Sequence, residues 1–294
     1  MLDIASNICV SSLQEAFAAL EADEKSILVA GGTDVLIGIR EGKYPEAHLI
    51  SIGSIPELKG VSRDPNGNIC IGPLTTFREL EEDPIIRQYV PILAQAAGTV
   101  GGPQIRAAGT IGGNICNGAT SADTASSLCA LDALLTIRTK LGTRTQSIHE
   151  HYLGPGKVAL KHNEILTAIV ISQKDYAGYT GAYKKFSMRN AMDIATLGCA
   201  LWMQITAQQA EIKDIRIACG VAAPTPMRAR RTEQALRGMH INQAGKIGPD
   251  LLRQEITPRD SWRASKAFRK QIAGEMLAQM IKEVIEQEEI QCYT

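Results

Sequence analysis

The feature that most constrains this chain is a pair of glycine doublets that each follow or join apolar, strand-like sequence. The first lies in V-A-G-G-T-D at 29–34, and the second lies in T-I-G-G-N at 110–114. Paired glycines let backbone N–H groups gather around an anion where a Cβ atom would clash. Either doublet alone is more typical of an ordinary turn. Together they predict a cradle for a diphosphate, such as that of a dinucleotide.

Composition excludes several classes of partner. The chain has 294 residues, with 31 Lys and Arg residues and 31 Asp and Glu residues, so its formal net charge is zero. Nucleic-acid-binding proteins usually carry a basic excess, so we expect no nucleic-acid partner. No apolar run approaches the roughly 18 residues of a membrane span. Residues 1–5 also lack the basic start of a signal peptide, and we expect a cytoplasmic protein.

The cysteines and histidines offer no cluster of metal ligands. The seven cysteines are odd in number and widely spaced, and no two form C-x-x-C. This pattern predicts reduced thiols rather than disulfides, and no iron–sulfur centre or structural zinc in this chain. His149 and His151 alternate as they would on one strand face, where we expect a surface pair rather than a metal site.

The elements around the first doublet form a β–α–β-like unit. We expect a helix over 12–22, capped by Ser11 or Ser12, with Glu15 completing a capping box with Ser12. A strand over 26–30, a short helix over 35–40 and a strand over 48–52 follow. The glycines do not spell G-x-G-x-x-G, which disfavours a Rossmann site for NAD.

Downstream, the sequence predicts a hairpin over 61–71, helices ending near 82 and 97, and a strand over 164–171. The Gly- and Tyr-rich segment 173–180 reads as a linker. We therefore expect a first domain over 1–175, with subdomains of about 1–55 and 56–175, and a second over 180–290. The second should contain strands over 193–207 and 211–221 and a long helix over 262–287.

An ordered series of motifs resembles the flavin subunit of molybdenum hydroxylases. The matching stretches are A-G-G-T-D at 30–34, T-I-G-G-N-I-C-N-G-A-T-S-A-D at 110–123, G-P-G-K at 154–157, Y-K-K-F-S-M-R at 183–189 and G-V-A-A-P-T-P at 220–226. The resemblance covers essentially the whole chain. It is nearest to the separate FAD-binding subunits of bacterial xanthine dehydrogenases.

The resemblance implies an α+β fold in two parts. A two-subdomain FAD-binding domain of the vanillyl-alcohol-oxidase (PCMH) type would be followed by a domain with a three-stranded antiparallel sheet and helices. Neither glycine segment has a histidine for flavin attachment, so FAD would be non-covalent. The resemblance also implies an oxidoreductase with an iron–sulfur partner carrying [2Fe–2S] clusters and a molybdopterin partner, as a dimer of heterotrimers. Electrons would pass through FAD to NAD⁺.

The resemblance further implies which residues meet the cofactor. The expected set is Ile27, Leu28, Val29, Ala30, Gly31, Gly32, Thr33, Asp34, Thr110, Ile111, Gly112, Gly113, Asn114, Asp123, Leu166 and Lys185. Backbone N–H groups of 31–33 would bind the diphosphate, with the Thr33 hydroxyl. A phosphate would repel Asp34, so we expect its carboxylate to accept backbone N–H bonds and hold the turn.

The remaining site residues each have a structural alternative. Asn114 would brace its loop, and Asp123 would bind the adenosine ribose or else cap a helix over 124–131. Leu166 would contact the flavin or else serve as a core leucine.

Lys185 would lie near the N1–C2 edge of the flavin and stabilise its anionic reduced form, or else be a solvated strand lysine. Lys184 would point to the opposite face of that strand. We leave open whether Arg106 contacts a phosphate or a partner. Hydride transfer from flavin needs positioning more than acid–base groups, so no catalytic side chain is expected.

Other functions remain open from the sequence. The chain also fits the flavin subunit of a related dehydrogenase of N-heterocycles, nicotinate or CO. A stand-alone FAD reductase would need a third domain with a catalytic serine or carboxylate, which the last 115 residues do not suggest. A nucleotide-binding assembly module that has lost its flavin is the non-enzymatic alternative.

Overall fold

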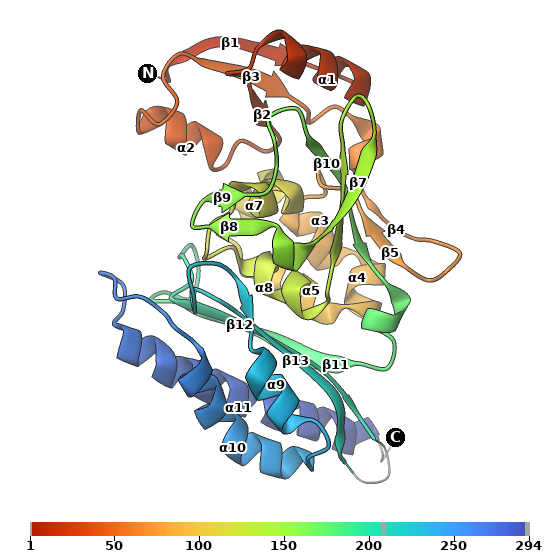
Figure 1. Ribbon diagram of the computed structural model, residues 1–294, viewed down its shortest axis with the longest axis vertical. Coiled ribbons are helices and arrows are strands. Elements are labelled where there is room, and N and C mark those ends of the chain that lie inside the picture. Colours follow the sequence, from red (N-terminus) through yellow and green to blue (C-terminus); the bar gives the residue numbers. More distant parts are fainter. Residues whose placement is uncertain (1, 207–209, 292–294) are drawn as a thin grey trace.

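The computed structural model describes residues 2–206 and 210–291, and its sheets form three tiers (Figure 1). The N-terminal tier is a parallel sheet of order β1-β3-β2. Its strands are β1 (Ile4–Cys9), β2 (Ile27–Val29) and β3 (Ala47–Ser51), and its helices are α1 (Leu13–Ala22) and α2 (Val35–Arg40). Burial of Leu13, Phe17 and Leu20 along one face of α1 fixes this helix against the sheet.

The middle tier is an antiparallel sheet of order β4-β5-β10-β6-β7. Its strands are β4 (Val61–Arg63), β5 (Ile69–Ile71), β6 (Leu134–Arg138), β7 (Thr143–Ser147) and β10 (Ile165–Ile171). The helices of this tier are α3 (Phe77–Glu82), α4 (Pro84–Tyr89), α5 (Pro91–Gly98), α6 (Pro103–Ala108), α7 (Ile111–Asn117) and α8 (Asp123–Ala130). A small hairpin of β8 (Tyr152–Gly154) and β9 (Lys157–Val158) lies beside α7 (Figure 1).

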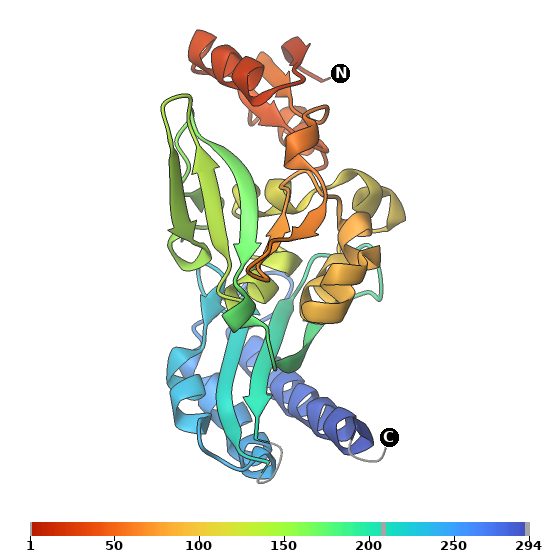
Figure 2. The same cartoon turned by 90° about the vertical axis from the view of Figure 1, so that its right-hand side faces the viewer.

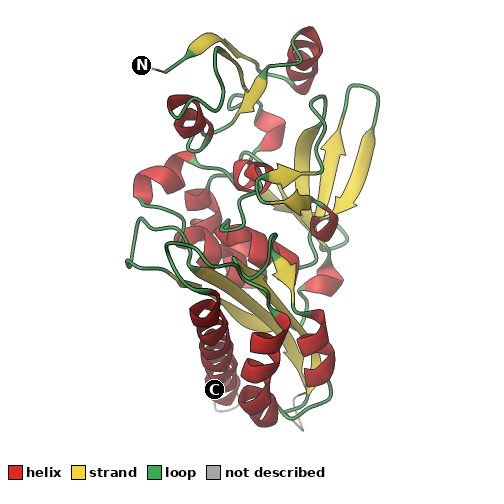
Figure 3. Cartoon of the chain, turned by 60° about the vertical axis from the view of Figure 1, so that its left-hand side comes forward, coloured by secondary structure: helices red, strands yellow, loops and turns green. Residues whose placement is uncertain are grey.

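The C-terminal tier is an antiparallel sheet of order β11-β12-β13-β14. It has three long strands: β11 (Thr180–Phe186), β12 (Leu197–Ile205) and β13 (Ile212–Gly220). The two-residue β14 (Met227–Arg228) lies at the edge of the sheet and pairs with β13. Helices α5 and α8 pack on one face of this sheet. Helices α10 (Ile241–Glu255) and α11 (Lys266–Gln291) lie on the other, with α9 (Arg230–Leu236) at the edge (Figures 2 and 3).

The observed fold confirms the predicted α+β class, and most predicted elements are present. The Ser12 hydroxyl caps α1 by accepting from the Glu15 N–H at 3.2 Å, as predicted. Helices α4, α6 and α10 were not predicted. Helix α10 contains Gly245, Gly248 and Pro249, residues that usually interrupt helices, and it forms because its apolar face is buried against α11. Helix α11 begins at Lys266, so the expected start at Trp262 is wrong.

None of the helices within the described ranges is long and apolar enough to cross a membrane.

Candidate cofactor site

The two glycine segments meet in space. A Cβ atom added to Gly31 would lie 1.7 Å from the carbonyl oxygen of Ala108, immediately before the second segment. Only glycine permits this approach of one backbone to another. Gly32 has a φ of +72°, a left-handed conformation that glycine adopts without strain. The sequence therefore predicted the convergence of the two segments correctly.

The first segment presents unused backbone donors. Among residues 2–206 and 210–291, no carbonyl or side chain accepts from the N–H groups of Gly31, Gly32 or Thr33. These residues are only half-buried, and they join β2 to the start of α2. Consecutive free N–H groups at a strand-to-helix turn form a concavity that binds anions.

The second segment is not a glycine turn but the first turn of α7. The N–H groups of Ile111 and Gly112 donate to the carbonyls of Thr75 and Pro73, at 3.0 and 2.8 Å. The Thr110 hydroxyl caps the helix by accepting from the Gly113 N–H at 3.1 Å. The expectation that both segments present free N–H groups is therefore wrong for the second.

The second glycine doublet is explained by close packing rather than by free backbone N–H groups for a ligand. A Cβ on Gly112 would lie 2.4 Å from the Cβ of Pro73, so any side chain there would push α7 away. Asn114 braces the segment, because its Oδ1 accepts from the Thr124 hydroxyl at 2.6 Å and ties α7 to α8.

The carboxylate of Asp34 does not hold the first turn. Asp34 occupies the N-cap position of α2, but its exposed side chain makes no capping hydrogen bond. The predicted role of this side chain as a backbone acceptor is therefore wrong.

Asp123 and Lys185 form a buried ion pair beside these segments. The Lys185 Nζ donates to Asp123 Oδ2 at 2.9 Å and to the Thr99 carbonyl at 3.0 Å, and both side chains are 7% exposed. The alternative of a solvated lysine is thus wrong. Lys184 points to the opposite face of β11, as the strand alternation predicts, and donates to Glu283 of α11 at 2.6 Å.

Asp123 is not the cap of α8. The N-cap is Ala122, and Asp123 is the first helical residue, so the capping alternative is wrong. Its second oxygen, Oδ1, accepts from the Tyr183 hydroxyl at 2.8 Å. Burial raises the pKa of Asp123, whereas Lys185 and Tyr183 act in the opposite direction. Sequence reasoning missed Tyr183 as a site residue, although it opens the Y-K-K-F-S-M-R motif at 183–189. The alternation that places Tyr183 and Lys185 on one face would have identified it.

Leu166 lies in the core of the middle tier. Its side chain is 5% exposed, and a bulge follows it where β10 pairs with β6. Its role as a core leucine is shown, and contact with a cofactor remains a proposal.

A small cavity adjoins Lys185. It measures about 170 Å³ and is bordered by residues of three segments: Gly98, Thr99, Gly101, Arg106, Lys185, Ser187, Asn190, Ala191, Met192 and Asp193. Arg106 donates to Glu81 at 3.0 Å, so its charge is paired within the chain. Two charged side chains that border the cavity are almost buried: Lys185, 7% exposed, and Asp193, 5% exposed.

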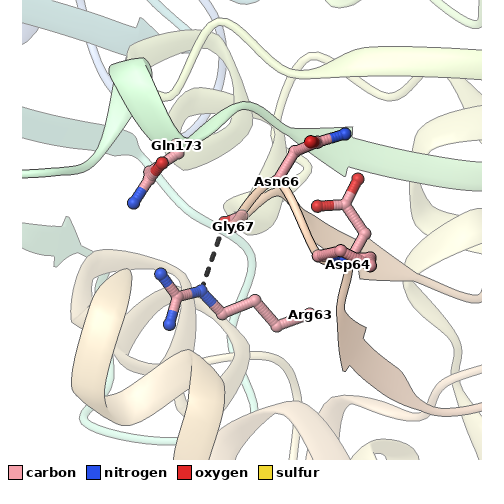
Figure 4. Close-up of a pocket in the computed structure, with 6 residues that line it drawn as sticks. Arg63, Asp64, Asn66, Gly67 and Gln173 are labelled. Atoms are coloured by element: carbon pink, nitrogen blue, oxygen red, sulfur yellow. Dashed lines mark hydrogen bonds between the residues drawn. The ribbon is translucent and has the colours of Figure 1, made fainter.

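A larger cavity of about 350 Å³ lies elsewhere, at the turn between β4 and β5 (Figure 4). Arg63 and Gln173 lie on either side of Gly67 in that view. The two charged side chains there already have partners. Arg63 Nε donates to the Gly67 carbonyl and to the Tyr176 hydroxyl, and Asp64 accepts from Asn68. This is a braced hairpin turn, remote in sequence from the glycine segments.

The two histidines depart from expectation. Residues 148–150 form a short 3₁₀ turn instead of a strand. The His149 Nε2 lies 2.6 Å from Asp132 Oδ1, whereas His151 is fully buried. The predicted surface pair is therefore wrong. In the part of the chain that the structure describes, no group of three His, Cys, Asp or Glu residues is arranged to hold a metal ion.

Two other motifs converge next to α8. G-P-G-K at 154–157 forms the turn of the β8–β9 hairpin, and the Gly156 N–H donates to the Gly118 carbonyl at 2.9 Å. G-V-A-A-P-T-P at 220–226 contacts the same loop, where the Val221 N–H donates to the Thr120 carbonyl at 3.0 Å. Both motifs therefore fix the loop that leads into Asp123.

Comparison with known proteins agrees with this geometry. Residues 4–173 match the family described as the FAD binding domain in molybdopterin dehydrogenase. Residues 181–284 match the CO dehydrogenase flavoprotein C-terminal domain.

Individual relatives match over nearly the full length. A putative xanthine dehydrogenase FAD-binding subunit of Escherichia coli (strain K12) is 40% identical over 288 residues, covering 97% of both chains. The carbon monoxide dehydrogenase medium chain of Hydrogenophaga pseudoflava is 31% identical over 269 residues, covering 90% of this chain and 92% of the relative. A solved carbon monoxide dehydrogenase from that organism superposes with a TM-score of 0.89 at 29% identity, covering 96% of this chain and 97% of that one. The chain therefore belongs to the family of FAD-binding subunits of molybdenum hydroxylases.

Proposed function

We propose that this chain binds FAD non-covalently and carries electrons within a multi-subunit xanthine dehydrogenase. The observation that carries the proposal is the row of free N–H groups at Gly31, Gly32 and Thr33, in backbone contact with Ala108. The relative at 40% identity, named for xanthine dehydrogenase, favours that substrate. The CO dehydrogenase relatives make a related hydroxylase the second candidate.

The residues of the first segment suit a diphosphate. The three N–H groups donate to phosphate oxygens, and the Thr33 hydroxyl adds a neutral bond. Residues Ile27–Val29 of β2 and Ala30 bring this segment to the edge of the sheet. Asp34 is exposed and makes no capping hydrogen bond, and its negative charge would not favour contact with the phosphates.

The start of α7 and the end of β11 complete the site. Thr110 to Asn114 supply a closely packed wall, and Leu166 packs behind it. The Asp123 carboxylate and the Lys185 ammonium lie 2.9 Å apart, so both would face the same part of a bound ligand. We therefore place both Asp123 and Lys185 at the flavin, which revises the role of Asp123 at the adenosine ribose. Bound FAD supplies two-electron redox chemistry, and the chain's own groups bind and orient it.

The complex would divide the remaining chemistry. An iron–sulfur partner would deliver electrons from its [2Fe–2S] clusters, a molybdopterin partner would hydroxylate the purine, and NAD⁺ would accept the electrons. Two copies of each chain would assemble as a dimer of heterotrimers.

Reconstitution of the full-length chain with FAD tests the proposal. We expect one FAD per chain, with the flavin absorption band near about 450 nm, and bleaching of that band by NADH. A colourless chain after reconstitution would overturn the proposal. A yellow chain that NADH does not bleach would overturn only the choice of NAD⁺. Co-expression with the adjacent reading frames, followed by mass and metal analysis, tests the partners.

A further inference from the structure

Tyr183 completes the hydrogen bonding of the Asp123–Lys185 pair. Its hydroxyl donates to Asp123 Oδ1 at 2.8 Å, while Lys185 donates to Oδ2 at 2.9 Å. Both donors come from one face of β11, two residues apart. The carboxylate is therefore held at both oxygens, and the Tyr183 side chain is itself 6% exposed.

A row of glycines gives the phenol its room. Lys185 pairs with Gly198 across β11 and β12, and Gly198 pairs with Gly220 across β12 and β13. A Cβ on Gly198 would lie 2.9 Å from the Tyr183 hydroxyl oxygen. A Cβ on Gly220 would lie 3.2 Å from the Thr120 carbonyl, just before α8. The row thus lets both the phenol and the start of α8 approach the sheet.

The main chain of Tyr183 is anchored as well. Its N–H donates to Gln95 Oε1 of α5 at 2.7 Å. Lys185 is bound to the Thr99 carbonyl at the end of the same helix. Strand β11 is thereby bound to α5 and its C-cap at two points, through the Tyr183 main chain and the Lys185 side chain.

We propose that Tyr183 is a positioning residue of the flavin site, whose hydroxyl fixes Asp123 and, through it, the ammonium of Lys185. This inference rests on the proposed function, because that function places Lys185 beside the flavin. Tyr183 acts through its neighbours and makes no contact with FAD.

The hydroxyl should control the charge that a bound flavin meets. Burial favours the neutral form of Asp123, and the donors Tyr183 and Lys185 oppose it. Without the hydroxyl, Asp123 takes up a proton more readily and Lys185 loses its counter-charge. A positive charge beside a flavin raises its midpoint potential. The other charged groups bordering this cavity are Arg106, paired with Glu81, and Asp193.

The decisive variant is Tyr183→Phe in the full-length, FAD-loaded chain. We expect one FAD per chain, as in the wild type, but a higher midpoint potential by spectroelectrochemistry. The difference should be larger at low pH than at high pH, because protonation of Asp123, which burial favours, removes the counter-charge of Lys185. Tyr179→Phe is the matched control, because it removes a tyrosine bond to Asp214 at 2.5 Å and should leave the potential unchanged.

Gly198→Ala tests the same contact without removing the hydroxyl. The new methyl group displaces the phenol, so we expect the same upward shift in potential. In a Tyr183→Phe background the methyl meets no hydroxyl, and Gly198→Ala should add nothing further. If both single variants bind FAD at the wild-type potential, the inference is wrong while the proposed function stands. A wild-type chain that takes up no FAD would overturn both. If Tyr183→Phe does not fold, Gly198→Ala alone decides.

Discussion

At the scale of single residues, Gly31 carries the contact on which the site depends. Gly31→Ala would place a methyl group 1.7 Å from the Ala108 carbonyl oxygen, so the two segments must separate. We expect a loss of roughly 1–3 kcal/mol of stability, as for other overpacked sites, and a larger relative loss of FAD affinity. Thermal melting and FAD titration by absorbance measure the two effects.

Gly142→Ala is the control for Gly31→Ala. A Cβ on Gly142 meets nothing within 4 Å, and its backbone is not left-handed, so neither quantity should change. Wild-type FAD affinity in Gly31→Ala would show that the first segment is not the cradle.

His151 should make the stability of the chain depend on pH. It is fully buried with neither ring nitrogen hydrogen-bonded within the described residues, and burial lowers its pKa to about 4, against a smaller opposing effect from the Ile115 backbone. The unfolded chain binds this proton at about pH 6.5, so stability is full above that pH and falls toward pH 4. The loss between about pH 7 and pH 5 should be roughly 2 kcal/mol.

Urea unfolding at several pH values measures this dependence. His151→Phe removes the titrating group and should flatten the curve between these pH values. His48→Gln is the comparison, because it removes a histidine whose side chain is 44% exposed and so opens no cavity in the core. An unchanged slope in His151→Phe would assign the pH dependence to other groups.

At the scale of elements, substitution of two helix-capping residues distinguishes an effect on stability from an effect on cofactor binding. The Thr110 hydroxyl caps α7 at the site, and the Ser12 hydroxyl caps α1, in the N-terminal tier. Thr110→Ala and Ser12→Ala should each cost about 1 kcal/mol of stability in urea unfolding. Only Thr110→Ala should also weaken FAD binding, because α7 forms a wall of the proposed site. Equal FAD affinity in both variants would contradict the assignment of α7 to the site.

The elements also show how far sequence reasoning reaches. Short elements with clear caps or turns, such as α1 and the β4–β5 hairpin, are predictable because their signals are local. Helix α10 is not, because tertiary burial overrides its glycines and proline. The convergence of the glycine segments followed from residue chemistry. The sequence did not predict that the second glycine segment begins a helix, because Gly-Gly is a poor helix signal and Thr110 also fits a turn.

The partner of Lys185 was also beyond local sequence reasoning. Asp123 and Lys185 lie 62 positions apart, and only the packing of α8 on the C-terminal sheet brings them together. The predicted domain boundary near 175–180 stays a prediction.

At the scale of the whole molecule, a charge cluster joins the middle and C-terminal tiers. Asp132, in the turn after α8, accepts from Arg228 of β14 at 2.7 Å and pairs with Arg216 of β13 at 3.1 Å. Its φ of +46° is one that aspartate tolerates better than most residues. Burial alone would raise the pKa of Asp132, but the His149 hydrogen bond and the two guanidinium groups outweigh it and hold the pKa well below its usual range.

The tiers should therefore loosen when Asp132 loses its charge. Asp132→Asn removes one carboxylate partner from two buried guanidinium groups, although Arg216 keeps Asp175 and Arg228 keeps Glu233. We expect a loss of roughly 2–4 kcal/mol in urea unfolding. We expect the lower part of that range because Asp132 is 29% exposed. The pKa is lowered in the folded chain, so this stabilisation is full above about pH 4 and is lost below it. The gap between wild type and Asp132→Asn should accordingly shrink as the pH falls from about 4 to about 2.

A surface pair gives the comparison for Asp132. Arg78 and Glu82 lie 3.3 Å apart on α3, with side chains 64% and 59% exposed, so Glu82→Gln should cost less than about 1 kcal/mol. A similar small loss in Asp132→Asn would mean that apolar packing alone joins the tiers. The expected larger loss, with a second unfolding transition appearing in the variant, would instead identify the Asp132 cluster as what makes the middle and C-terminal tiers unfold as one. Rigid docking of the tiers matters for function because Lys185 lies in the C-terminal sheet, whereas the glycine segments lie in the other two tiers.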